Sequence, residues 1–540
     1  MPTLHWVGKD KVVNHHHDVP FRVLDKVSTF SAPAGLPANS TDNRIIHGDN
    51  LEALKSLLPE FEGRVKCIYI DPPYNTGNEG WVYNDAVNDP KIKRWLGQVV
   101  GKEGEDLSRH DKWLCMMYPR LKLLRRLLSE DGVILMSLDG NEHRFAELLM
   151  DEIFGSGNRI ETFIWKKSYG GGAKSKQVVN LHEYILCFAR DRSRIGAIEL
   201  PPNDDVRRYY KFEDEKSEVR GPYRLQPLAT NSMDARPNLR YPISFEGEEI
   251  WPEKQWQWAR DRAFAALEAG ELVIKKIRGK WSVNYKQYLR DADGEERGAK
   301  LYSIVEAIYT QQGTNELKAM FGDGKTFDFP KPTALVLKLI QAFSHKDSLV
   351  LDSFAGSGTT GQAVLAANVA DAGNRRFLLI ETEGYADTIT AERIRRVMSG
   401  YGEGQKAVNG LGGSFDYYTV GEPMFLPDDN LNEAVGCEAI RGYVAYSEGI
   451  PAADRRAADN PHSPYLLGLN RETAWIFHYE PERATSLDME FLSTLRFGGE
   501  SGAGKPGTAI IYADRCLLSA AFMTRHGIIF KKIPRDITRF

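Results

Sequence analysis

The sequence predicts an α/β fold built on a doubly wound, largely parallel sheet, and three stretches carry this prediction. Residues 64–70 (Arg-Val-Lys-Cys-Ile-Tyr-Ile) are rich in apolar and β-branched types without helical spacing, which is typical of a strand buried on both faces of a parallel sheet. Residues 348–352 have the same character and lead through a glycine-rich turn to an apolar helix start at Gln362. Residues 376–380 form a third such run. Open α/β sheets bind their ligands at the carboxyl ends of such strands.

Length and composition limit the class of protein. At 540 residues the chain exceeds the roughly 250–300 residues at which a single core stops growing, so we expect two or three domains. The formal net charge of −4 does not indicate a nucleic-acid binder, so any nucleic-acid contact would depend on local basic surface. The five cysteines form no C-x-x-C pair, which indicates a reducing compartment and no zinc site. No apolar signal core or long apolar run is present, which predicts a cytoplasmic protein without a membrane partner.

The turn Asp71-Pro72-Pro73-Tyr74 directly follows the first predicted strand. Two consecutive prolines donate no backbone hydrogen bonds and have φ fixed near about −65°, so the strand ends there and its groups are held in one arrangement. A carboxylate, the Pro72 carbonyl and an aromatic face suit a flat molecule with an amino group at its edge, because two acceptors meet the amine hydrogens and the ring offers a stacking surface. An ordinary strand-ending turn with Asp71 on the surface is the alternative.

The turn after the second predicted strand carries glycines, which let a backbone approach a ligand closely at a strand-to-helix junction. Its G-x-G spacing differs from the dinucleotide pattern G-x-G-x-x-G, and no Lys follows as in a P-loop. The next strand ends in Glu381, where an acidic residue would accept ribose hydroxyls. Nucleotide-like binding without a phosphate grip points to an adenosyl ligand. The turn consists of Asp352, Ser353, Phe354, Ala355, Gly356, Ser357, Gly358, Thr359 and Thr360.

The two motifs together resemble the S-adenosylmethionine-dependent DNA amino-methyltransferases, and their order along the chain resembles the β class. The run at 71–78, with Tyr83-Asn-Asp85 soon after, is similar to modification subunits of type III restriction systems and their stand-alone relatives. The resemblance covers residues 12–400. It implies a Rossmann-like methyltransferase sheet with circularly permuted motifs, S-adenosyl-L-methionine as cofactor and double-stranded DNA as substrate. A homodimer and a restriction (helicase–nuclease) or other defence subunit are the candidate partners.

The resemblance also implies roles for individual residues. Asp71 and the Pro72 carbonyl, in the motif that Pro73 completes, would accept the two hydrogens of the target amine, and Tyr74 would stack on the extruded base. Asp49 would contact the cofactor. An equally supported alternative is that its carboxylate lies at the N-terminus of a helix and is stabilised there by the helix dipole. The implied cofactor contacts are Asp49, Asp71, Lys331, Pro332, Asp352, Phe354, Ala355, Gly356, Ser357, Gly358, Thr359, Thr360 and Glu381; no metal is expected.

The pattern along the chain predicts five parts. Residues 1–43 should form a loop-like polar arm, with His15, His16 and His17 too close together to face one metal ion from a regular element. Residues 44–202 and 326–400 are the catalytic and cofactor halves of the methyltransferase domain. Residues 203–325 mix aromatic and basic residues, which suits a target-recognition insert, although the aromatics would also serve as the core of a small β-rich insert. After a linker at 400–413, residues 414–540 should form a small α/β domain for oligomerisation or partner contact.

Three local expectations concern the catalytic half. Strands at 162–165 and 183–188 should pair antiparallel at the edge of the sheet. The helix at 113–128 should expose a basic face of Arg120, Lys122, Arg125 and Arg126. The polar stretch from Asn75 to Lys112 should be a loop whose Trp81 and Tyr83 either stack on an extruded base or pin the loop to the body.

These expectations combine into one function: transfer of a methyl group to the N6 amine of a flipped-out adenine at specific DNA sites, in a restriction-modification or phage-defence system. In the family, Asp at the first motif position favours adenine N6, whereas cytosine-N4 enzymes more often carry Ser there. The alternatives are a cytosine-N4 enzyme, a non-catalytic recognition subunit, and a methyltransferase for RNA or protein. None of the five cysteines follows a proline, so the nucleophile of 5-methylcytosine enzymes is absent.

Overall fold

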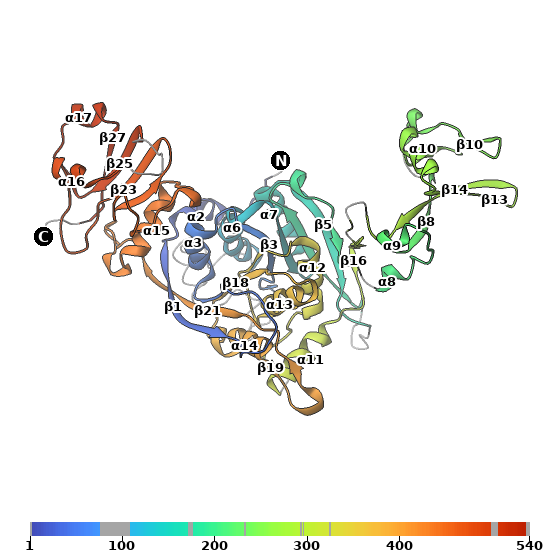
Figure 1. Cartoon of the computed structure of the whole chain (residues 1–540). Coiled ribbons are helices and arrows are strands. Elements are labelled where there is room, and N and C mark those ends of the chain that lie inside the picture. Colours follow the sequence, from blue (N-terminus) through green and yellow to red (C-terminus); the bar gives the residue numbers. More distant parts are fainter. Residues whose placement is uncertain are drawn as a thin grey trace. The chain divides into compact units, whose positions relative to one another are not determined.

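The computed structural model describes residues 3–75, 109–170, 177–202, 204–231, 234–291, 294, 296–322, 326–497 and 506–535. The chain divides into two compact units (Figure 1). The main unit comprises Met1–Gly196 and Tyr302–Phe540, and the insert unit comprises Ala197–Leu301.

The main unit is organised around a mixed sheet whose described strands run in the order β1-β21-β2-β18-β17-β3-β4-β6-β5-β16. The six neighbours from β21 to β4 are parallel to one another. The predicted doubly wound α/β sheet is therefore confirmed. The strands are β1 (Arg22–Ser31), β2 (Asn43–His47), β3 (Val65–Ile70), β4 (Leu128–Leu138), β5 (Arg159–Lys166), β6 (His182–Ala189), β16 (Ile304–Val305), β17 (Leu349–Asp352), β18 (Arg376–Glu381) and β21 (Ser414–Pro423).

Helices cover both faces of this sheet, as two-sided burial of the central strands requires. On one face α3 (Asn50–Phe61), α6 (Arg109–Leu127) and α7 (His143–Phe154) bury their apolar residues in one core with alternate residues of the strands. On the other face lie α12 (Thr333–Phe343), α13 (Thr359–Asp371) and α14 (Glu392–Ser399) (Figure 1). In no described part of the chain is there a helix long and apolar enough to cross a membrane.

The N-terminal segment differs from the predicted polar arm. Two short helices, α1 (Lys9–Val12) and α2 (His15–Asp18), pack on the main unit, with Val12 in its core. The carbonyl of His16 accepts a hydrogen bond from Lys55 Nζ at 2.9 Å. Strand β1 then pairs antiparallel with β21 at the edge of the sheet. The prediction of a loop-like arm was wrong, because the alternating polar residues of an edge strand resemble an irregular segment.

The same pairing changes the C-terminal boundary. Strand β21 begins at Ser414, where the sequence suggested that a separate domain starts, but it runs parallel to β2 within the main sheet. Phe415 and Tyr417 are buried there. The segment from 400 to 413 is also more than a linker, since β19 (Gly400–Tyr401) and β20 (Val408–Asn409) form a small hairpin.

The last part of the chain contains a β-α-β-α-β arrangement, which agrees with the α/β fold predicted for residues 414–540. Strands β23 (Thr473–Phe477), β25 (Thr508–Ala513) and β27 (Ile528–Lys532) are parallel, and an additional antiparallel strand, β22 (Leu466–Leu469), borders β23. The connecting helices are α16 (Met489–Thr494) and α17 (Ala520–Arg525). The preceding helix α15 (Cys437–Ser447) contacts the methyltransferase part, where Tyr443 packs edge-on against Phe21 with ring centroids 5.0 Å apart.

Two expectations for the catalytic half have different outcomes. β5 and β6 pair antiparallel, as predicted, although β16 adds a further parallel strand beyond β5. The prediction that α6 exposes all four basic residues is wrong, because Arg120 is buried and donates from Nε to Asn50 Oδ1 at 2.6 Å. The predicted stacking residues Trp81 and Tyr83 lie outside the described residues, as do Asn78 and Asp85.

The insert unit contains an antiparallel sheet of β8 (Tyr223–Pro227), β14 (Lys280–Tyr288) and β13 (Leu272–Ile277), together with α10 (Arg260–Glu268). Trp256, Tyr241 and Val283 lie in its core, so several of its aromatics do serve as internal packing. The unit ends at Leu301. The sequence extended this insert to 325, but residues 302–322 lie with the main unit.

Helix α11 (Thr310–Phe321) lies in this reassigned segment and packs closely on the chain at Pro330 and Lys331. The contact depends on Gly313, since a Cβ there would lie 2.3 Å from the Pro330 carbonyl oxygen and 3.1 Å from the Lys331 carbonyl carbon. Glycine inside a helix is unfavourable by about 1 kcal/mol relative to alanine, so its presence here has a packing reason.

We therefore expect Gly313→Ala to destabilise the protein, because overpacking against backbone costs about 1–3 kcal/mol and exceeds the gain in helix propensity. Thermal unfolding of the full chain measures this as a lower Tm. Gly442→Ala in α15 is the matched control: its Cβ would have nothing within 4 Å, so its Tm should stay equal or rise. A Tm for Gly313→Ala as high as that of Gly442→Ala would contradict the close packing of α11.

Candidate active site

A cavity of about 670 Å³ lies at the carboxyl ends of β3 and β17. Asp71, Pro72 and Tyr74 from the turn after β3 line it, together with Phe354 and Gly356 from the turn after β17. The two sequence motifs thus share one cavity. The remaining predicted residues that line it are Lys331, Asp352, Ala355, Ser357, Thr359 and Thr360.

Positive φ angles require glycine in the turn after β17. Gly356 has φ +52° and Gly358 has φ +84°, in the left-handed region that L side chains rarely adopt. The Gly356 N–H donates to Glu381 Oε2 at 2.7 Å, and its carbonyl accepts from Thr390 Oγ1 at 2.6 Å. Because both backbone groups of Gly356 have partners, the turn is held in a single conformation.

Arg393 fixes the other side of this turn. Its side chain is fully buried, and Nη1 donates to Ser357 Oγ at 2.8 Å and to Thr359 Oγ1 at 2.9 Å. Nη2 reaches Glu316 Oε2 in α11 at 3.1 Å. A single guanidinium therefore ties the glycine turn to the helix that forms another wall of the cavity.

Two buried carboxylates support the turn from beneath. Asp352 Oδ1 accepts from the Phe354 N–H at 3.0 Å and Oδ2 from Thr360 Oγ1 at 2.5 Å. Burial raises the pKa of Asp352 to about 7 and that of Glu381 to about 8. Because these hydrogen-bond donors are neutral, they offset only part of the desolvation of the charged carboxylates.

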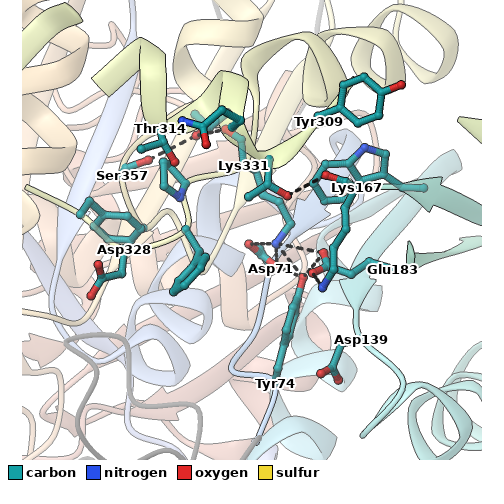
Figure 2. A pocket seen from close by; sticks show the side chains of 18 of the residues that line it. Asp71, Tyr74, Asp139, Lys167, Glu183, Tyr309, Thr314, Asp328, Lys331 and Ser357 are labelled. Atoms are coloured by element: carbon teal, nitrogen blue, oxygen red, sulfur yellow. Dashed lines mark hydrogen bonds and ion pairs between the residues drawn. The ribbon is translucent and has the colours of Figure 1, made fainter. Parts of the chain in front are cut away.

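In the turn after β3, Asp71 accepts hydrogen bonds from one cationic donor, Lys331, and from one hydroxyl donor, Tyr74 (Figure 2). Lys331 Nζ lies 2.9 and 2.7 Å from the two Asp71 carboxylate oxygens and 2.6 Å from the Tyr74 hydroxyl. The Tyr74 hydroxyl donates to Asp71 Oδ1 at 2.8 Å. Glu183 joins the cluster, with Oε2 3.1 Å from the Tyr74 hydroxyl and Oε1 2.9 Å from Lys167 Nζ.

The two carboxylates of this cluster differ in their electrostatics. Burial raises the pKa of Asp71, and the nearby Lys331 offsets only part of that effect. Burial acts in the same direction on Glu183, but Lys331 and Lys167 together outweigh it and hold the pKa of Glu183 below its ordinary value. Glu183 is therefore the more firmly ionised of the two.

Several lining residues were not among the sequence candidates. Lys167 follows β5, Glu183 lies on β6, and the antiparallel pairing of Trp165 with Glu183 brings these two strands' polar ends together. The signal in the sequence was an acid at the start of one predicted edge strand and a lysine just after the other. The other unassigned lining residues include Asp139, Tyr169, Tyr309, Thr310, Gln311, Thr314, Phe327 and Asp328.

Five predicted residues do not line the cavity. Asp49 accepts from the Leu51 and Glu52 N–H groups at 2.9 and 3.1 Å, which is the helix-capping alternative. The Pro73 carbonyl accepts from the Trp113 indole N–H at 2.7 Å, and Pro332 precedes the first residue of α12. Gly358 and Glu381 act on the cavity through the turn that they shape. Among the described residues, no group of three or more His, Cys, Asp or Glu side chains could hold a metal ion.

The comparisons with known proteins agree on one family. Residues 65–445 match the family model described as DNA methylase, of the N6/N4 methyltransferases. The StyLTI Mod subunit of a type III restriction-modification enzyme from Salmonella typhimurium is 33% identical over 463 residues, which cover 80% of this chain and 68% of that protein. The EcoPI Mod subunit from Escherichia phage P1 is 31% identical over 75% of this chain and 66% of its own length. The type II methyltransferase M.KpnI of Klebsiella pneumoniae is 29% identical over 64% of this chain and 82% of that protein.

The pKa of Asp352 predicts how stability varies with pH. Unfolded Asp titrates near about 4, so between pH 4 and about 7 the folded state keeps a proton that the unfolded state has released, and stability falls as pH rises through this window. Asp352→Asn removes this titration while keeping a side-chain oxygen for the Phe354 N–H. We expect its Tm to exceed that of the wild type at pH 8 and to approach it near pH 4.

Asp131→Asn is the control of opposite sign. Although partial burial acts to raise the pKa of Asp131, its hydrogen bonds to Lys66 and Ser129 and the charge of Lys66 together outweigh burial and lower the pKa. This variant should therefore lose stability relative to the wild type as pH rises. Equal pH dependence of Tm in Asp352→Asn and the wild type would contradict the buried, proton-holding state of Asp352.

Proposed function

The chain belongs to the N6/N4 DNA methylase family, and from this premise we propose that it transfers a methyl group from S-adenosyl-L-methionine to the N6 amine of an adenine in double-stranded DNA. The observation that carries the proposal is the single cavity shared by the Asp71 turn and the Gly356 turn. One turn offers acceptors for an amine, and the other offers an open backbone surface for an adenosyl group.

The residues around the glycine turn fit this cofactor. A Cβ at Gly356 would lie 3.2 Å from Phe327 Cζ, so glycine keeps this surface open to a flat ring. Phe354 provides an aromatic wall, and the side chain of Asp71 lines the same cavity. We assign cofactor binding to Lys331, Asp352, Phe354, Ala355, Gly356, Ser357, Thr359 and Thr360. S-adenosyl-L-methionine supplies a methyl group on a positively charged sulfur, which is already activated for transfer.

The remaining chemistry is positioning of the acceptor. A base in a duplex cannot present its exocyclic amine, so the target nucleotide must be rotated out of the stack. Asp71 and the Pro72 carbonyl accept the two amine hydrogens and aim the nitrogen lone pair, and the Tyr74 ring stacks on the base. Fixing these groups in line with the donor lowers the barrier through orientation and preorganised charge. Asp at position 71 favours adenine.

The insert unit is the candidate for target recognition. Its β13–β14 hairpin exposes Lys275, Lys276, Arg278 and Lys280, a local basic surface on a chain with a net charge of −4. Lysine and arginine that neutralise phosphates supply affinity for DNA without specifying sequence. We further propose that the protein acts with a restriction or other defence subunit, in analogy to its Mod relatives, and forms a homodimer. A cytoplasmic location fits its five unpaired cysteines.

The proposal predicts labelled methyl transfer from S-adenosyl-L-methionine to duplex DNA, and not to RNA or protein, with N6-methyladenine as product at one sequence context. Asp71→Asn should lower the transfer rate by about a hundredfold or more, since it removes a charged acceptor from the reacting amine. Cofactor binding, measured by calorimetry, should persist.

Asp131→Asn is the matched control, because Asp131 is also paired with a lysine at 2.7 Å but lies outside the cavity, and its transfer rate should equal that of the wild type. If the product were N4-methylcytosine, the target base would be cytosine and not adenine. Full activity of Asp71→Asn would contradict the assigned acceptor.

The glycine turn predicts the converse defect. Gly356→Ala should weaken cofactor binding by about tenfold or more, because φ +52° and the Phe327 contact leave little room for a side chain. DNA binding by filter retention should be unaffected. Gly157→Ala serves as control, because a Cβ there would meet nothing within 4 Å. Unchanged cofactor affinity in Gly356→Ala would contradict the assignment of this turn to the cofactor-binding site.

A further inference from the structure

The ammonium of Lys331 lies where the proposed mechanism needs the target amine. It donates to both Asp71 oxygens, at 2.9 and 2.7 Å, and lies 4.8 Å from the centroid of the Tyr74 ring (Figure 2). An amine that is held by Asp71 against the Tyr74 ring would need these contacts. Two nitrogen donors cannot occupy one position, so Lys331 must move before a base can bind to Asp71 in this way.

Glu183 is placed to receive the displaced ammonium. Its Oε2 is 3.6 Å from Lys331 Nζ, an ion pair that is not yet a hydrogen bond. A shift of about 1 Å would bring the two atoms to the distance of a charge-assisted hydrogen bond. The side chain of Glu183 is only 9% exposed, and the pKa of its carboxyl is held low by Lys331 and Lys167, so it stays a charged acceptor.

The charges of the cluster explain why a lysine would be kept so close to the acceptor. Asp71 and Glu183 are balanced by Lys167 and Lys331, with Lys167 Nζ 2.9 Å from Glu183 Oε1. A buried Asp71 that lost its cation entirely would take up a proton and could no longer accept an amine hydrogen at that oxygen. A cation that moves only to the neighbouring carboxylate keeps Asp71 ionised and still frees its oxygens.

We propose that Lys331 is a stand-in for the target amine and that Glu183 takes over its ammonium when the base enters, which makes Glu183 a positioning residue for the methyl acceptor. This inference rests on the proposed function and adds to it a residue, Glu183, that the catalytic motif does not contain. No bond is formed or broken in the exchange, since one ion pair replaces another.

The first test is Glu183→Gln, which keeps the size of the side chain and removes the charge that receives Lys331. Single-turnover methyl transfer at saturating cofactor should slow by about ten- to hundredfold, the range for a lost hydrogen bond to a charged group. The KM for cofactor should change by less than about twofold, because losing one neighbouring charge is expected to affect the base and not the cofactor.

A double variant separates this role from a merely structural one. Adding Lys331→Met to Glu183→Gln leaves no ammonium to relocate, and Asp71, which then lacks its cation, should accept the amine only at a pH high enough to ionise it. At saturating cofactor and at the upper plateau of its pH–rate profile, the double variant should therefore transfer methyl groups at least about tenfold faster than Glu183→Gln alone at the same pH, a coupling that independent sites would not show. A double variant no faster than the single one at that plateau overturns the proposal.

Binding gives a second measurement that does not depend on the folding of the double variant. Glu183→Gln should weaken binding of a duplex with adenine at the target position, and should not weaken binding of the same duplex carrying purine, which lacks the amine. Equal weakening for both duplexes overturns the proposal.

Glu448→Gln is the matched control. Like Glu183, Glu448 is a nearly buried carboxylate: its side chain is 8% exposed, pairs with Lys531 at 2.6 Å and accepts from the Tyr512 hydroxyl. It lies outside the cavity. Its transfer rate should equal that of the wild type. A wild-type protein that transfers no methyl group to DNA overturns the proposed function and this inference together. Transfer by the wild type with a fully active Glu183→Gln overturns this inference alone.

Discussion

The structure depends on the parallel pairing of β3 with β17, in which Val350 lies opposite Cys67 and Leu351 opposite Ile68. These two strands are far apart in the sequence, and they are hydrogen-bonded neighbours at the centre of the sheet. Because parallel strands end at the same edge, the pairing brings the turn at 71–74 beside the turn at 352–360. Every later feature of the site follows from this register: the shared cavity, the approach of Lys331 to Asp71, and the support of the glycine turn by Glu381 on the neighbouring strand.

The electrostatics of the cavity follow from where its carboxylates obtain their partners. Asp352 and Glu381 accept from backbone and hydroxyl groups beneath the glycine turn, so burial dominates and their pKa values rise. Glu183 faces two lysines and stays ionised. Asp71 lies between these extremes, with one lysine and a raised pKa. The same sheet edge thus holds carboxyl groups of different proton affinity: Asp352 and Glu381 support the glycine turn, whereas Asp71 and Glu183 pair with lysines.

Helix α11 follows the insert unit along the chain, and Arg393 ties this helix to the glycine turn. The helix begins shortly after the insert unit ends, and its Thr310, Gln311 and Thr314 line the cavity. Gly313 lets it approach the backbone that carries Lys331, and Arg393 ties its Glu316 to Ser357 and Thr359 of the glycine turn. The walls contributed by α11, by Lys331 and by the glycine turn are therefore fastened to one another by buried polar contacts, which are stronger in a low-dielectric interior than in water.

The doubly wound sheet and its two ligand-binding turns could be predicted from the sequence, because buried strands, paired prolines and a glycine-rich turn are local patterns that can be recognised without knowing their partners. The antiparallel pair of strands at the edge of the sheet was also predictable from the sequence. Only the tertiary structure decided that β1 and β21 join the main sheet, that Arg120 is buried, and that α11 belongs to the cavity wall. The pairing of Lys331 with Asp71 and of Glu183 with Lys167 was decided there as well. Each of these depends on contacts between residues far apart in the chain, and the polarity of a single segment does not reveal which distant group will satisfy it.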